Sequence, residues 1–152
     1  MLWRELVPEP DPDAAARWYR HAIAYLPNYV KARVHLAEIY ASHDRTDDAE
    51  ELVLPALSSR DPEVQWRLAE VLMAQGRFQE AQMHLNGARL AFDGHLAKYL
   101  VAFTDHAAAF YVASGNDGRP ALELARANVT NRPTRQAVKQ AHEIAVRACT
   151  SL

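Results

Sequence analysis

The sequence predicts an all-α protein, built from about eight helices with no β-sheet. Two observations predict this fold class. Alanine, the residue that enters a helix at the lowest cost, accounts for 28 of the 152 residues, against five glycines. Apolar residues also recur at three- and four-residue steps along most of the chain, as they do on an amphipathic helix.

Small residues repeat at a nearly constant interval, which indicates a stack of similar units. Ala15, Ala49 and Ala81 are separated by 34 and 32 residues, and another alanine lies seven residues beyond each of them. Leucine–alanine pairs occur 32 residues apart at Leu36 and Leu68. Small residues let two helices approach closely. Since one helix pair cannot bury its apolar face alone, successive antiparallel pairs are expected to stack.

The expected helices follow from the periodicity and from its interruptions. They cover residues 13–26, 30–42, 46–58, 63–75, 78–92, 96–114, 119–131 and 135–149. Asp44-Arg45 and Gly76-Arg77 interrupt the apolar pattern inside two units and predict tight turns. Pro55 lies inside the third helix, where it lacks a backbone donor and should disturb the helix. Thr134 can cap the last helix, whose single apolar face suits a terminal capping element.

The predicted organisation is an extended arm over residues 1–12 and a single helical domain over residues 13–152. The arm is rich in proline, which favours extended backbone, and carries an apolar cluster of Trp3, Leu6 and Val7. Two hypotheses fit this cluster. It covers the exposed side of the first helix of its own chain, which we favour, or it exchanges into a neighbouring chain.

The residues that recur at this interval resemble the pattern of the tetratricopeptide repeat (TPR) family, whose helix–turn–helix unit has about 34 residues. The unit that carries the likeness best contains Leu68, Ala69, Gly76, Phe78, Ala81 and Ala88, with Pro62 before it. The preceding unit also matches, at Leu36, Ala37, Tyr40, Ala49 and Ala56, and has Asp44 in place of the turn glycine. Looser matches extend it to about residues 13–133. The resemblance implies a right-handed solenoid. Abundant alanine and the 14 arginines against three lysines favour a bacterial member.

Composition argues against several classes of function. A net charge of −2 disfavours a nucleic-acid binder, which normally has a basic surplus. No apolar run approaches the length of a spanning helix, so no membrane association is expected. Cys149 is the only cysteine, so an intrachain disulfide cannot form. With no apolar signal stretch near the N-terminus, we expect a cytoplasmic protein.

No motif for catalysis or metal binding is present in the sequence. None of the seven histidines has a second histidine three or four residues away, and neither HExxH nor CxxC occurs. There is no nucleophile elbow and no phosphate-binding loop. We therefore expect neither an enzyme nor a bound cofactor or metal.

The remaining candidate is a binding surface. In the TPR family the first helix of each pair lines the concave face, and the resemblance places ten residues of this chain there: Lys31, Val34, His35, Glu38, Trp66, Arg67, Glu70, Met73, Asp105 and His106. Trp66 would act as an aromatic anchor, unless it packs in the core. Val34, Glu38 and Glu70 disfavour the lysine-rich clamp that captures acidic C-termini. A bound segment should be mixed in charge or modestly basic.

The function expected from these features is a non-enzymatic interaction module, a scaffold or adaptor that binds a peptide or protein segment in a concave helical groove. The alternative is a structural protein whose groove and N-terminal arm mediate homo-oligomerisation. Arg89 is expected on the outer face, away from either surface.

Overall fold

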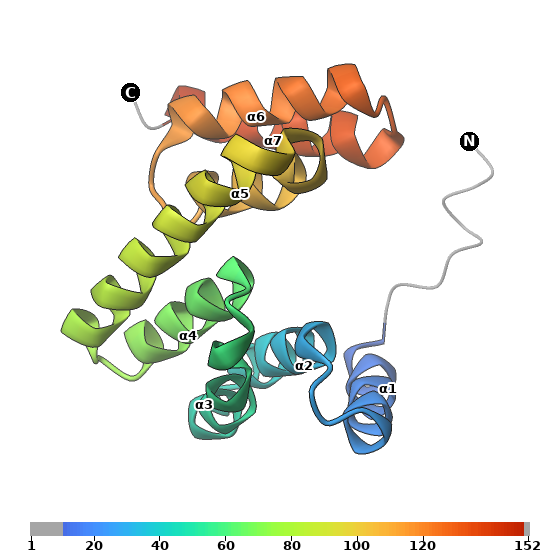
Figure 1. Cartoon of the computed structure of the whole chain (residues 1–152), viewed down its shortest axis with the longest axis vertical. Coiled ribbons are helices and arrows are strands. Elements are labelled where there is room, and N and C mark those ends of the chain that lie inside the picture. Colours follow the sequence, from blue (N-terminus) through green and yellow to red (C-terminus); the bar gives the residue numbers. More distant parts are fainter. Residues whose placement is uncertain (1–10, 151–152) are drawn as a thin grey trace. The chain divides into compact units, whose positions relative to one another are not determined.

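The computed structural model describes residues 11–150, and side chains as far as residue 148 (Figure 1). Within that range every regular element is helical, which confirms the all-α prediction. The α-helices are α1 (Pro12–Tyr25), α2 (Val30–Ser42), α3 (Thr46–Val53), α4 (Pro62–Ala74), α5 (Phe78–Val112), α6 (Gly118–Asn131) and α7 (Arg135–Thr150). A 3₁₀-helix, η1 (Leu54–Ser59), follows α3. No helix in the described range is both long and apolar enough to cross a bilayer.

The described chain divides into two compact units, the first ending at Ala81 and the second beginning at Gln82. In the first unit α1 packs on α2, and α2 and α3 both contact α4. Short loops join successive helices of this unit. The core of this unit consists of apolar residues that are almost completely buried: Ala32, Leu36, Ala37, Ala49, Val53, Val64, Leu68, Ala69 and Leu72. The expectation of one domain over residues 13–152 stays a prediction.

The second unit contains most of α5 together with α6 and α7, which pack on each other. Phe92 and Phe110, on the two halves of α5, stack with ring centroids 5.1 Å apart and are both fully buried. Gly115 is also buried, and a Cβ placed there would lie only 2.8 Å from the Tyr111 Cα. The chain therefore leaves α5 along a path that only glycine fits without a shift.

Alanines that recur at the repeat interval lie where neighbouring helices pack closely. Ala49, Ala81 and Ala88 have no exposed surface, and Ala56 is buried as well. Any larger side chain at these positions would force the neighbouring helices apart. The register read from the repeat is therefore confirmed for these four residues.

Helix starts and turns follow the predicted chemistry in most places. Asp11 and Asp61 each accept a hydrogen bond from the backbone N–H two residues on, directly before a proline at the first helical position. Thr134 Oγ1 accepts from the Ala137 N–H at 3.1 Å, which confirms it as a cap. Gly76 has a φ of 78° and Asp44 a φ of 59°, so aspartate takes the left-handed position that glycine holds in the next turn.

Two helix boundaries differ from the prediction, and both have a local cause. Pro55 cannot donate to the α-helical ladder, so α3 ends at Val53 and the chain continues as η1. The fifth and sixth predicted helices form one element, α5, which kinks at Tyr99 (φ −140°, ψ 55°) and not over residues 93–95, between the two predicted helices. Gly94 continues the helix.

The predicted N-terminal cluster of Trp3, Leu6 and Val7 lies outside the described residues, as does the Cys149 side chain. Helix α1 begins at Pro12, one residue before the predicted start, because Asp11 caps it.

Candidate functional site

Most of the predicted site residues lie together on the first unit. We call this surface the α2–α4 face. It consists of Lys31, His35 and Glu38 on α2, and of Asp61, Glu63, Trp66, Arg67, Glu70 and Met73 at the start of α4 or along it. On each helix the residues are spaced by three or four positions, so they share one side. Asp61 and Glu63 join this group through the ion pairs they form.

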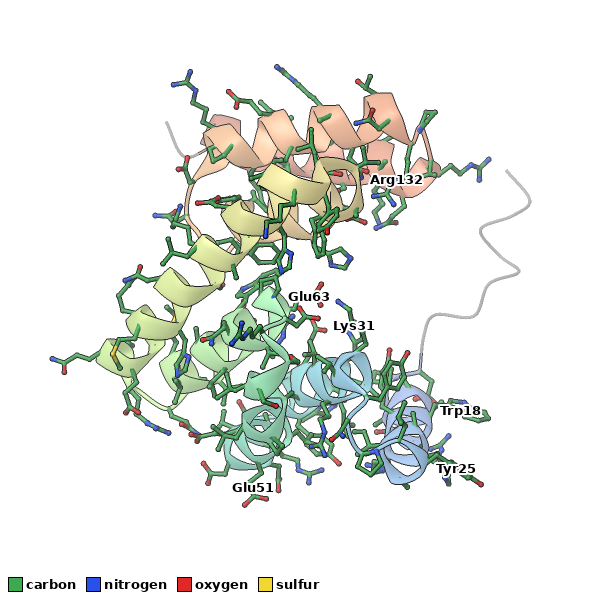
Figure 2. The ribbon with its side chains drawn as sticks, in the orientation of Figure 1. Trp18, Tyr25, Lys31, Glu51, Glu63 and Arg132 are labelled. Carbon is green, nitrogen blue, oxygen red and sulfur yellow. The ribbon has the colours of Figure 1, made fainter. Side chains whose placement is uncertain are left out.

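Ion pairs connect the two helices at one end of the face. Lys31 Nζ lies 2.8 Å from Glu63 Oε1 and 3.8 Å from Asp61 Oδ2. Figure 2 shows Lys31 and Glu63 pointing toward each other from α2 and α4. Glu63 is buried, so its carboxylate is largely withdrawn from water and the ammonium group compensates for that loss.

Arg67 organises the middle of the face. Its Nη2 lies 3.3 Å from Glu38 Oε1, and its Nη1 forms an ion pair with Glu70. The Trp66 indole Nε1–H donates to Glu70 Oε1 at 2.8 Å, and the Arg67 guanidinium lies 5.3 Å from the Trp66 ring centre. Glu70 therefore holds both Trp66 and Arg67 in place. Among the described residues nothing accepts a hydrogen bond from the buried Arg67 Nε.

The face carries a net negative charge. Four carboxylates, those of Glu38, Asp61, Glu63 and Glu70, stand against the two permanent cations Lys31 and Arg67, which leaves a formal charge of −2. Glu38 is the most accessible of these carboxylates, with 51% of its side chain exposed. The surface therefore attracts basic groups, in agreement with the charge expected of a ligand.

The structure corrects one predicted site residue and locates the others. Val34 is only 1% exposed and packs in the core, because it lies about 100° around α2 from its neighbour His35. Val34 therefore offers no surface to a ligand. His35 stacks on Tyr19 at 5.5 Å. Trp66 is half-buried, between the two alternatives that the sequence left open, and Met73 is exposed.

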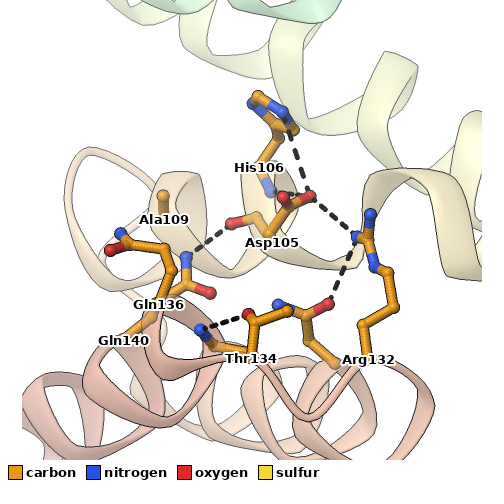
Figure 3. Close-up of a pocket in the computed structure, with 9 residues that line it drawn as sticks. Asp105, His106, Ala109, Arg132, Thr134, Gln136 and Gln140 are labelled. Carbon is orange, nitrogen blue, oxygen red and sulfur yellow. Dashed lines mark hydrogen bonds and ion pairs between the residues drawn. The ribbon is translucent and has the colours of Figure 1, made fainter.

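Asp105 and His106 lie in the second unit, where they line a pocket of about 260 Å³ (Figure 3). We call it the α5–α7 pocket. Its other lining residues come from α5, α6, α7 and the loop before α7: Ala109, Asn128, Arg132, Thr134, Gln136, Ala137 and Gln140. The two predicted residues thus belong to a real cavity. That they continue the α2–α4 face as one groove stays a prediction.

The polar groups that line the pocket bond to one another. Arg132 Nη2 lies 3.6 Å from Asp105 Oδ1 and donates to Asn128 Oδ1 at 3.2 Å. Gln140 Nε2 donates to the Asp105 carbonyl oxygen at 2.8 Å. Charge, amide and hydroxyl groups at fixed positions suit recognition of a polar segment by hydrogen bonds.

Sequence reasoning missed the contribution of α6 and α7 to this pocket. Gln136 and Gln140 are one turn apart near the start of the last helix. The set of helix positions predicted to line the concave face could therefore have been extended into residues 135–149. Arg132 gave no such signal, because it is a single long side chain at the end of α6.

The described residues hold no group of three or more histidine, cysteine, aspartate or glutamate side chains that could bind a metal ion. The paired charges of both surfaces are suited to binding another molecule.

Comparison with known proteins gives a family match for the first part of the chain. Residues 9–61, which include α1 to η1, match the model of the tetratricopeptide repeat. This segment of the chain is therefore similar to tetratricopeptide repeats. The match covers the part of the chain in which Leu36, Ala37, Ala49 and Ala56 carried the resemblance. Repeats of this family mediate protein–protein interactions, so the match supports an interaction module in general.

One solved structure, "Crystal structure of MamA", aligns with 93% of this chain and with 91% of its own chain, at 18% sequence identity and a TM-score of 0.48. The comparison with curated proteins gave no match.

Proposed function

We propose that this chain is a non-enzymatic adaptor of the tetratricopeptide repeat type that binds a protein segment on the α2–α4 face, and that this segment carries a basic side chain beside an apolar one. The observation that supports the proposal is the cluster of Trp66, Arg67 and Glu70 with Glu38 on the neighbouring helix. It combines an aromatic ring with surplus carboxylates on one surface.

Trp66 would contribute most of the affinity and the carboxylates most of the selectivity. A half-buried indole held by Glu70 loses little side-chain freedom when it is covered, so its burial favours binding. The accessible Glu38 and Glu70 would pair with lysine or arginine, speed association and reject acidic segments. Met73, an exposed and flexible thioether, would adapt to the apolar side chain.

A peptide-array experiment tests the proposal. The full chain would be applied to arrayed peptides in which an apolar core is flanked by lysine or arginine, or by aspartate or glutamate at the same positions. We expect binding to the basic set. Isothermal titration with a selected peptide would then compare Trp66→Ala and Glu70→Gln with Glu51→Gln, each variant being checked for helicity by circular dichroism.

Glu51 is the matched control because it is exposed on α3, and Figure 2 shows it pointing away from Lys31 and Glu63. We expect Trp66→Ala to weaken binding by roughly thirtyfold, about 2 kcal/mol. Glu70→Gln should weaken it several-fold, while Glu51→Gln should have no effect. Preferential binding of the acidic peptides, or equal losses for Glu70→Gln and Glu51→Gln, would rule out the α2–α4 face as the binding surface.

A further inference from the structure

The outer side of α1 exposes large aromatic residues that the packing of the first unit does not use. Trp18 is 75% exposed and Tyr25 90% exposed, and Leu26 and Tyr29 continue the exposed surface beyond the end of the helix. Trp18 and Tyr25 are seven residues apart, which is two helical turns, so they lie on the same side. Figure 2 shows both pointing away from α2. Clustered exposed aromatic residues are typical of an interaction surface.

Arg17 and His21 are exposed on α1 beside these aromatic residues. Asp13 lies in the first turn of the helix, and no aspartate or glutamate occurs from Ala14 to Val30, the stretch that holds Trp18 and Tyr25. Arg20 is directed toward α2, where its Nη1 donates to the Tyr40 hydroxyl at 3.2 Å. We call the surface made by Arg17, Trp18, His21, Tyr25, Leu26 and Tyr29 the α1 face. It is aromatic, and Arg17 is its permanent cation.

The α1 face and the α2–α4 face are complementary in charge and in apolar character. One offers Arg17 beside exposed aromatic rings. The other offers Glu38 and Glu70 beside Trp66 and Met73. The two cannot meet within one chain, because α1 is fixed against α2 by its opposite side. They can meet only between two copies.

We propose that the α1 face of one copy docks on the α2–α4 face of a second copy, an inference that rests on the α2–α4 face being the binding surface of the proposed function. The contact is heterologous, since each copy contributes a different surface. An assembly built in this way still presents one unused α1 face at one end and one unused α2–α4 face at the other. Association therefore continues into longer assemblies, unless the rotation closes a ring.

The charges favour this contact over a symmetric pairing of two α1 helices. In a symmetric pair of two α1 faces, both surfaces carry Arg17, and neither supplies a carboxylate from the turns that hold Trp18 and Tyr25. Like charges across an interface disfavour association. The heterologous contact instead brings arginine toward glutamate.

The test is sedimentation velocity of the full chain between about 1 and 100 µM, a range that reports on weak association. Arg17→Glu and Glu38→Lys are the informative variants, since both side chains are well exposed and Arg67 keeps Glu70 as a partner in the second variant. Glu51→Lys is the control. Circular dichroism verifies that each variant is folded.

We expect the parent chain to form larger species as its concentration rises, and to do so less at high salt. Arg17→Glu and Glu38→Lys should each weaken association by roughly tenfold or more, whereas Glu51→Lys should leave it unchanged. An equimolar mixture of Arg17→Glu and Glu38→Lys should associate again, because each supplies the face that complements the other.

Three results would overturn the inference: a parent chain that stays monomeric at the highest concentration, association that survives either informative variant, or an equal loss in Glu51→Lys. Peptide binding measured on the Arg17→Glu variant separates this inference from the proposed function. A monomeric chain that still binds basic peptides retains the proposed function and loses only the second copy as a partner.

Discussion

Arg77 Nη1 donates to Glu50 Oε1 at 2.7 Å, which ties the residue before α5 to α3, 27 positions earlier in the chain. Gln75 Nε2 donates to the other carboxylate oxygen of Glu50 at 2.9 Å. Burial by itself would raise the pKa of Glu50, but the hydrogen bonds from Gln75 and Arg77 outweigh it and leave the pKa below its ordinary value. The carboxylate form of Glu50 therefore stabilises the packing of α3 against the α4–α5 turn.

This arrangement predicts an acid-dependent loss of stability. Because the pKa of Glu50 is lower in the folded chain, its contribution is complete above the unfolded pKa of about 4.3 and disappears as the pH falls through the folded value. We expect Glu50→Gln to lower the free energy of unfolding by about 0.5–1 kcal/mol at neutral pH, and by little at about pH 3. Urea unfolding at both pH values measures the difference. Glu51→Gln, next to it but exposed, should show no such dependence.

Ala49 tests the close helix packing of the first unit. It has no exposed surface, so the extra methyl groups of leucine would force α3 away from α2. We expect Ala49→Leu to lower the free energy of unfolding by about 1–3 kcal/mol. Ala97→Leu, on the exposed side of α5, is the matched control and should change stability little. If both variants melt at the same temperature, the buried alanine column does not limit helix approach.

The fold was predictable from the sequence where the signal is local or repeated. Ala49 and Ala81 recur at the repeat interval, and periodicity alone predicted that both lie in the core. Both are completely buried. The cap at Thr134 and the break at Pro55 follow from the chemistry of single residues. The kink at Tyr99 had no such signal, because neither proline nor glycine occupies that position.

The candidate site was predictable only as a set of helix positions. The repeat shows that Val34 and His35 are neighbours on an inner helix, but it does not determine which of the two side chains faces the core. The structure shows that Val34 does. Arg89 was expected on the outer face. It donates instead to the Gly115 carbonyl oxygen at 2.6 Å and lies 5.2 Å from the Tyr111 ring centre. A long side chain such as that of Arg89 can bond to residues far away in the sequence. The periodicity of the sequence does not predict such partners.

Glycines at two positions predict opposite effects of the same substitution. A Cβ at Gly115 would lie 2.8 Å from the Tyr111 Cα and 3.0 Å from the Phe110 carbonyl oxygen, so the backbone must move. We expect Gly115→Ala to lower the free energy of unfolding by about 1–3 kcal/mol. Gly94 lies within α5 with nothing within 4 Å of the added atom. Gly94→Ala should therefore raise stability by about 0.5–1 kcal/mol. Thermal melts of the two variants in parallel measure both effects. A Gly115→Ala variant more stable than the parent would show that a methyl group fits at this position without a backbone shift.

Tyr111 predicts a second pH dependence, on the alkaline side. Its ring is buried, and its hydroxyl donates to Asp93 on the first half of α5. Burial first, and then the hydrogen bond to the Asp93 carboxylate, raise the pKa of Tyr111 to about 12. The folded chain thus favours the neutral phenol. Its contribution to stability is complete below the unfolded pKa of about 10 and is lost as the pH rises from there toward the folded value.

Absorbance at the wavelength of tyrosinate measures this directly, because one tyrosine should ionise later than the others in the folded chain. Tyr111→Phe should remove that late step. It should also flatten the fall in stability between about pH 10 and pH 12, although the variant is less stable than the parent at neutral pH because Asp93 loses its donor. Tyr25→Phe, at a residue that is 90% exposed, is the control and should keep the late step. A parent chain whose tyrosines all ionise together near their ordinary pKa would show that the Tyr111–Asp93 hydrogen bond does not persist in solution.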